Sequence, residues 1–189
     1  MKFTQSCRIH EKKIYRNEAL FYSDQALDDK TNFKTFIKGA YKYLGQSYPK
    51  FFKMDRLSKL GFIAASVLFS DRVLSAYAPE EIAVVMANRH STLVTDTKHC
   101  ESIKNREAYF PSPSVFVYTL PNILVGEICI RYGFKGENAF FISNQFDQDF
   151  MYQYANLLFQ SGETKACLVG WVDYKDEADY SAILHLLET

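Results

Sequence analysis

The sequence feature that most constrains the fold is an alternation of short apolar runs with longer helical patterns in the second half of the chain. Residues 81–87, 139–142 and 165–172 are short apolar runs, which are typical of buried strands. Residues 115–132 and 147–160 lie between them and have helical patterns. Strands that alternate with helices predict an α/β fold, in which a sheet is flanked by helices.

The clearest helical pattern of the first half is residues 54–74. Apolar and small residues recur there at spacings of three and four. The small side chains of Gly61, Ala64 and Ala65 permit close approach of another element. We therefore expect one long packed helix in this segment.

The remaining predictions of secondary structure are looser. Residues 33–44 read as a helix that ends at Gly45, a suitable C-cap. Residues 7–15 alternate weakly and predict a first strand, and residues 23–32 are polar and predict a loop. Residues 178–187 fit a closing strand or helix.

Length and charge limit the class of protein. The 189 residues, 48% of them apolar, fit a single domain over 1–189. The 22 basic and 22 acidic residues balance, so no general positive field predicts nucleic-acid binding. We find no apolar run of membrane-spanning length and expect no span.

The cysteines and the N-terminus favour a cytoplasmic location. The four cysteines form no C-x-x-C pair, which favours reduced thiols. The first 16 residues lack the apolar run of a signal peptide. Cys129 and Cys167 fall in predicted elements, where core packing is a better explanation than catalysis.

Four features over residues 53–173, roughly two-thirds of the chain, occur in a recognisable order. They are Lys53-Met54-Asp55 before a helix with Gly61 and Ala64-Ala65, Phe110-Pro111-Ser112 before the next helix, Tyr132-Gly133 followed by Gly136-Glu137-Asn138, and Ser143-Asn144-Gln145 followed by Gly162. Together they resemble the N-terminal half of the β-ketoacyl-acyl carrier protein synthase family.

The resemblance implies one half of a thiolase-like fold, with a mixed sheet flanked by helices. In an ungapped alignment from Gly136 to Gly162, Gln145 occupies the position of the family's nucleophilic cysteine, with Ser143, Asn144 and Phe146 as neighbours. Glutamine at this position resembles chain-length factors and decarboxylating loading domains. The second role would need two active-site histidines from the family's C-terminal half, and no histidine here matches them.

Family condensation would need chemistry that these residues do not provide. It uses a thiolate at a helix N-terminus, an oxyanion hole and histidines. The amide nitrogen of Gln145 is not a useful nucleophile, and Asp147 and Asp149 add negative charge nearby. We predict no catalytic residue, cofactor or metal for condensation. The alternative interpretation of Gln145 is an ordinary polar residue at the start of a helix, although a relic of the nucleophile position is favoured over it.

Lys50, Lys53, Arg56 and Lys59 form a basic cluster. A solvated helix face is the usual explanation of such a cluster. The resemblance implies a second reading, because the family uses positive residues in this region to dock the acidic acyl carrier protein.

Two other groups of residues are open to more than one reading. Six aromatic residues could line an acyl pocket, although core packing is the simpler explanation: Tyr41, Tyr43, Phe51, Phe52, Tyr109 and Phe110. Residues 90–105 are polar and predict a loop with a short helix. His90, His99 and Cys100 lie there, but a metal site would need a further ligand.

The segment 147–160 tests the half-fold directly. In the complete family fold the corresponding helix is buried on all sides. Here the apolar stripe Phe146, Phe150, Tyr154, Leu157 and Leu158 occupies one face, which predicts a surface helix. We expect three layers, with the strand at 139–142 available for pairing across a two-fold axis.

The resemblance therefore implies a non-catalytic ketosynthase-like accessory subunit in fatty acid, polyketide or polyene biosynthesis. Its expected partners are a full-length ketosynthase and an acyl carrier protein, in a homo- or heterodimer. Two alternatives stay open. One is a small enzyme with a different site, such as a decarboxylase or a thioesterase-like enzyme, and the other is a self-associating structural protein.

Overall fold

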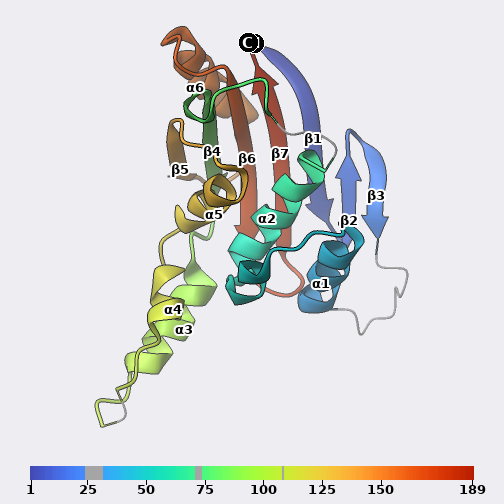
Figure 1. The fold of residues 1–189 in the computed structure, drawn as a ribbon. Helices are drawn as coiled ribbons and strands as arrows, with labels where there is room; N and C mark the ends of the chain where they lie inside the picture. The colour runs from blue at the N-terminus through green and yellow to red at the C-terminus, as the bar shows by residue number, and fades with distance from the viewer. Residues whose placement is uncertain (24–31, 71–73, 108) are drawn as a thin grey trace.

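A seven-stranded mixed sheet forms the centre of the protein in the computed structural model, which describes residues 1–23, 32–70, 74–107 and 109–189 (Figure 1). The strand order is β3-β2-β1-β7-β6-β4-β5. The strands are β1 (Lys2–His10), β2 (Lys13–Arg16), β3 (Ala19–Ser23), β4 (Ile82–Asn88), β5 (Asn138–Ile142), β6 (Ala166–Tyr174) and β7 (Tyr180–Glu188).

The parallel part of the sheet contains the three strands that the apolar runs predict. β4 pairs in parallel with both β5 and β6, and helices connect the three strands. Gly136 shows how closely the chain packs here: a Cβ at this position would lie 2.5 Å from the carbonyl oxygen of Ile82. The predicted α/β class and the mixed, helix-flanked sheet are confirmed.

β5 departs from the expectation of a buried strand. It is the last strand of the sheet, and its end residues Asn138 and Ile142 are exposed. Among the described residues only one side of β5 has a strand neighbour, and pairing of the other edge across a two-fold axis stays a prediction. The closing segment is a strand, β7, which is antiparallel to both β6 and β1.

The N-terminal segment was wrongly predicted as one strand over 7–15. It is an antiparallel meander of β1, β2 and β3. The turn between β1 and β2 uses Glu11 and Lys12, with φ of 47° and 59°. Tight hairpin turns with positive φ usually contain glycine or asparagine, so this turn carries no sequence signal.

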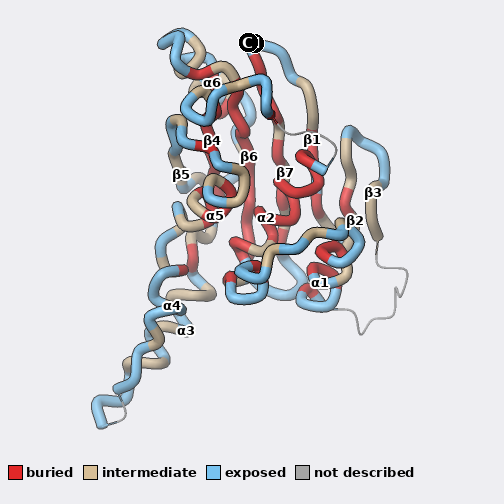
Figure 2. Tube along the Cα trace, viewed as in Figure 1, coloured by how far each residue is buried: buried red, intermediate tan, exposed pale blue. Residues whose placement is uncertain are grey.

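Helices cover the two faces of the sheet unequally, which gives three layers (Figure 2). One face packs against α1 (Phe33–Tyr43), α2 (Arg56–Leu68) and α5 (Ile123–Tyr132). The other face packs against α6 (Gln148–Gln160). α2 is the most deeply buried helix, and every residue from Leu60 to Leu68 is buried.

The predicted long helix over 54–74 is shorter than expected. Asp55 is its N-cap and accepts a hydrogen bond from the Ser58 N–H at 2.8 Å. α2 ends at Leu68, and the Ser70 hydroxyl then donates to the Val67 carbonyl. That bond satisfies a carbonyl that another helical turn would have used.

Two more helical segments differ from the predictions. The pattern over 115–132 is divided into α4 (Pro113–Val117) and α5, and Pro121 lies at the break. The segment 90–105 contains α3 (Leu93–Ile103), a longer helix than expected. α3 and α4 project from the body as an arm (Figure 1). The loop predicted over 23–32 lies largely outside the described residues.

Candidate functional site

The carboxyl ends of the three parallel strands bring Gln145 to the edge of the sheet. The chain leaves β5 at Ile142, and the Ser143 N–H donates to the Asn88 carbonyl at the end of β4, at 2.9 Å. The Ser143 hydroxyl then donates to the Gln145 carbonyl at 2.8 Å. The turn is thus built by Ser143, and the side chain of Gln145 is exposed.

The helix that follows this turn has an acidic N-terminus. Asp147 is the N-cap of α6 and accepts a hydrogen bond from the Phe150 N–H at 2.9 Å. Asp149 lies in the first turn. Both carboxylates compensate the positive end of the helix dipole, which in a thiolate enzyme would stabilise the nucleophile.

Phe146 anchors the turn against the sheet. Its ring centroid lies 6.5 Å from that of Trp171 and 5.9 Å from that of His185. The Nδ1 atom of His185 is 3.0 Å from the Tyr152 hydroxyl, and burial lowers the pKa of this histidine. The imidazole is therefore favoured as a neutral group packed beneath α6.

The inward face of α6 is rotated relative to the predicted apolar stripe. Its fully buried residues are Met151 and Ala155, whereas Phe150 and Leu157 are exposed by 42% and 63%. A shallow cavity of about 220 Å³ lies beside the helix start, lined by Ala87, Phe141, Ile142, Ser143, Asp147, Phe150 and Met151. The surface helix predicted from the sequence is present, and Phe146, Tyr154 and Leu158 of the predicted stripe pack partly buried against the core.

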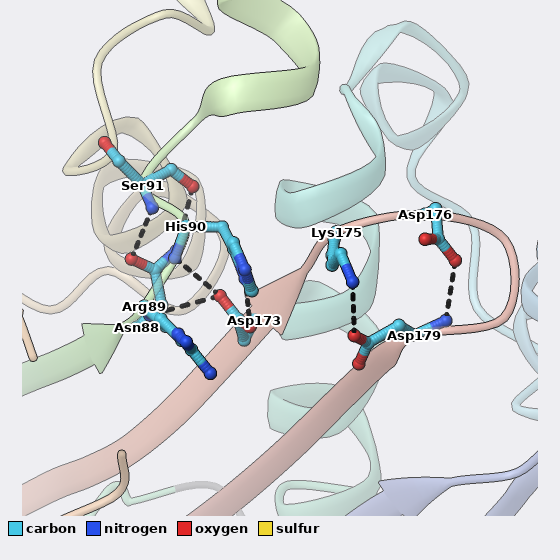
Figure 3. A network of polar contacts seen from close by, with 8 residues as sticks. All are labelled: Asn88, Arg89, His90, Ser91, Asp173, Lys175, Asp176 and Asp179. Atoms are coloured by element: carbon cyan, nitrogen blue, oxygen red, sulfur yellow. Dashed lines mark hydrogen bonds and ion pairs between the residues drawn. The ribbon is translucent and has the colours of Figure 1, made fainter. Parts of the chain in front are cut away.

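A polar network at the same edge was missed by the sequence analysis (Figure 3). Asp173, at the end of β6, accepts hydrogen bonds from the backbone N–H groups of Arg89 and His90 at 3.1 and 3.0 Å. Its second oxygen lies 2.7 Å from Nδ1 of His90. Asp173 thus joins the carboxyl end of β6 to the turn that follows β4.

This turn is conformationally unusual. Ser91 has a positive φ of 49°, and the Asn88 side chain accepts from the Ser91 N–H at 3.0 Å and donates to its carbonyl at 2.9 Å. The sequence offered only a weak sign of this network: Asn88 and Asp173 each follow directly after a predicted strand. The Asn88 side chain bonds to the nearby Ser91, and nothing in the sequence links Asp173 to Arg89, 84 residues earlier in the chain.

The predicted basic cluster is divided in the structure. Lys53, Arg56 and Lys59 line a cavity of about 530 Å³ between α1, η1 (Pro49–Lys53), α2, α3 and α4. Lys50 does not line it, because its ammonium lies 2.9 Å from the buried carboxylate of Glu127. Three lysines far from the cluster in sequence complete the rim: Lys34, Lys38 and Lys98.

The cavity concentrates positive charge. Burial lowers the pKa of Lys59, and the nearby cations Arg56, Lys34 and Lys98 lower it further, against the opposing effect of Asp55. Arg56 is ion-paired with Glu177 at 3.0 Å. We name this cavity, with its six cationic side chains, the basic pocket.

The other candidate residues are placed as follows. Tyr41 and Phe51 stack in the core with centroids 4.2 Å apart, whereas Tyr109 and Phe110 are exposed. His99 packs near Phe116, and no group of three metal-binding side chains occurs among the residues that the structure describes.

The thiols that were expected in the core lie there. Cys167 is fully buried, and Cys129 is partly buried against the core. Burial raises the pKa of Cys167 to about 12 and that of Cys129 to about 11. Both thiols are therefore protonated and unreactive at neutral pH.

Comparison with solved structures confirms the resemblance at the level of the fold. The chain aligns over 99% of its length with the ishigamide ketosynthase/chain length factor, at 18% identity and a TM-score of 0.71. It aligns over its whole length with the ketosynthase ApeO in complex with its chain length factor ApeC from Xenorhabdus doucetiae, at 14% identity and a TM-score of 0.61. A third match is the AntDE:AntF complex, a type II polyketide synthase acyl-carrier protein with its ketosynthase bound to the hexaketide, at 13% identity, 82% coverage and a TM-score of 0.61.

These comparisons define a protein with the thiolase-like fold of ketosynthases and chain length factors. The chain spans 61%, 78% and 58% of the three matched chains. No protein-family model matches the sequence, and no curated protein matches it. Within the described ranges, no helix is long and apolar enough to cross a membrane.

Proposed function

We propose that this protein is a non-catalytic, ketosynthase-like accessory subunit of a fatty acid, polyketide or polyene assembly system. The observation that carries the proposal is the combination of the fold with Gln145 at the turn before α6. The fold matches ketosynthase and chain-length-factor structures over the whole chain. The resemblance aligns Gln145 with the nucleophilic cysteine of the family. A glutamine amide cannot replace a thiolate as a nucleophile, so this position is not catalytic in the proposal.

The free edge of β5 supports a partner that completes the sheet. Exposed apolar residues occur on β5 and on α5, a helix that contacts it: Ile142 on β5 is exposed by 56%, and Ile130 on α5 by 66%. An unpaired strand edge beside apolar side chains favours association with another chain. The proposed partner is a full-length ketosynthase, in a heterodimer. A homodimer through the same edge is the alternative.

An acyl carrier protein is the second proposed partner. Lys53, Arg56 and Lys59 offer positive charge at one surface, where an acidic protein would gain attraction. Lys50 contributes less to such a surface than the sequence suggested, because Glu127 already neutralises it. A cytoplasmic location belongs to the same proposal, since carrier-dependent synthesis is expected there.

Affinity purification from the native cells, followed by mass spectrometry, tests the proposal. Recovery of a full-length ketosynthase or an acyl carrier protein would support it and identify the pathway. Recovery of this chain alone, under conditions that retain known carrier complexes, would contradict it. That result would favour the self-associating protein or the independent enzyme, and the His90–Asp173 pair would be the first place to look for the latter.

A further inference from the structure

The basic pocket lies on a different face of the sheet from Gln145. Its walls come from α1, η1, α2, α3 and α4, and its buried residues Phe33, Phe51 and Met54 belong to the core beneath α2. Phe146, next to Gln145, packs with the core beneath α6. A ligand in the basic pocket therefore occupies a site separate from the nucleophile-equivalent position.

The positive charge of the pocket is poorly balanced by protein groups. Six cationic side chains line it, against one carboxylate, that of Asp55. Arg56 has an ion-pair partner in Glu177. Lys34, Lys38, Lys53 and Lys98 have no carboxylate within ion-pair distance in the part of the chain that the structure describes.

Both oxygens of the single carboxylate, that of Asp55, already accept hydrogen bonds from neighbouring residues. One oxygen of Asp55 accepts from the Ser58 N–H at 2.8 Å, and the other accepts from the Thr95 hydroxyl at 2.9 Å. Burial raises the pKa of Asp55, which makes its negative charge harder to maintain. The pocket thus gathers like charges from four elements, an arrangement that an added anion would stabilise.

The floor of the pocket is apolar. Ile37, Met54, Val94 and Val115 line it, and the ring of Phe52 at its rim is 56% exposed. The volume of about 530 Å³ falls in the range of about 300–1,000 Å³ that is usual for small-molecule sites. Positive groups above an apolar floor suit a ligand with an anionic head and an apolar body.

We propose that the basic pocket binds an organic phosphate, a phosphate ester that carries an aliphatic or aromatic group. A phosphate has a charge of about −1.5 to −2 at neutral pH and three acceptor oxygens, so it can engage several lysines at once. A monocarboxylate offers one charge and two oxygens. The converging lysines of α1, α2 and α3 therefore favour the phosphate, and the apolar floor selects an ester over the free ion.

Hexyl phosphate is a suitable probe, titrated into the full chain by calorimetry with inorganic phosphate and 1-hexanol as comparisons. We expect saturable one-to-one binding of hexyl phosphate, at least about tenfold tighter than either comparison, and weaker binding at higher salt. The double variant Lys34→Glu/Lys98→Glu should weaken it at least about tenfold. Both side chains are exposed, so folding, monitored by circular dichroism, should be unchanged.

Lys135→Glu is the matched control, because Lys135 is an exposed lysine outside the pocket. It should leave binding unchanged. Absence of saturable binding, equal affinity for inorganic phosphate, or full binding by the folded double variant would each overturn the inference. The outcome is independent of partner recovery: a chain that binds hexyl phosphate but no ketosynthase would keep this inference and lose the proposed function.

Discussion

The two faces of the sheet differ in how completely this chain covers them. Beneath α2 the core contains the aromatic stack of Tyr48, Phe51 and Phe62, and almost the entire helix is buried. Beneath α6, only Met151 and Ala155 of the helix are fully buried. The first face is complete within one chain. The second leaves apolar helix surface exposed at Phe150 and Leu157, and the proposed partner would cover surface of this kind.

Truncation of a buried ring on the α2 face should have the largest effect. Phe62 is fully buried, so Phe62→Ala should lower the free energy of unfolding by about 3–5 kcal/mol. Leu157→Ala on α6 should change it by less than about 0.5 kcal/mol, because that side chain is exposed by 63%. Urea unfolding of both variants measures the contrast, and equal costs would contradict it.

Removal of Asp173 should have the next largest effect. Asp173→Ala leaves the N–H groups of Arg89 and His90 without their acceptor and removes the partner of the His90 ring. We expect a loss of about 1–3 kcal/mol in the free energy of unfolding. Asp173→Asn should cost less than Asp173→Ala, since an amide oxygen can still accept from the two N–H groups. A cost below that of Leu157→Ala would show that the network is dispensable.

Thiol labelling compares how readily the two faces of the sheet open. Cys7 lies in the core under α2 and Cys167 in the core under α6, and both are buried. If the thinner layer opens more readily, a single-cysteine variant that retains Cys167 should react several-fold faster than one that retains Cys7. The exposed Cys100 provides the upper limit of the rate. Faster labelling of Cys7 would show that the α2 face opens more readily than the α6 face, and would contradict this expectation.

The pH dependence of Asp55 should give the smallest effect. Its pKa is raised above the ordinary value of 3.8, chiefly by burial, so the folded chain holds this proton more tightly than the unfolded chain. The resulting stability is fully present below that value and is lost as pH rises through the raised pKa. Asn retains the N-cap acceptor and does not titrate. Asp55→Asn should therefore gain stability relative to the native chain between about pH 3 and 7, as measured by thermal unfolding.

A constant difference between Asp55→Asn and the native chain across that range would contradict the raised pKa. Asp147→Asn, at the exposed N-cap of α6, serves as the comparison for a cap that lies in water.

The parts of the fold with strong local signals were predictable from the sequence. The apolar runs at β4 and β6 and the capped helix α6 agree with the expected positions within a few residues. The N-terminal meander was not predictable, because Glu11 and Lys12 adopt positive φ without the usual turn residues. The end of α2 depends on a local hydrogen bond of Ser70 that helical periodicity does not encode.

The candidate sites were predictable only in part. The order of short motifs led to Gln145, and the local basic cluster contained three of the pocket's cations, Lys53, Arg56 and Lys59. The contributions of Lys34, Lys38 and Lys98 arise from tertiary packing that brings α1 and α3 beside α2. The removal of Lys50 from this surface by Glu127, 77 residues away in sequence, likewise has no local signature. Long-range polar pairs of this kind become visible only when the fold is known.

The most direct test of the central claim is the binding of a co-purified ketosynthase to the double variant Ile130→Glu/Ile142→Arg, measured by light scattering of the purified complex. Both side chains are exposed in this chain, so the variant should fold normally yet fail to form the complex. Leu20→Arg, an equally exposed apolar residue on β3 at the opposite edge of the sheet, should form it fully. Normal assembly of the folded double variant would contradict the claim that a partner completes the sheet at β5.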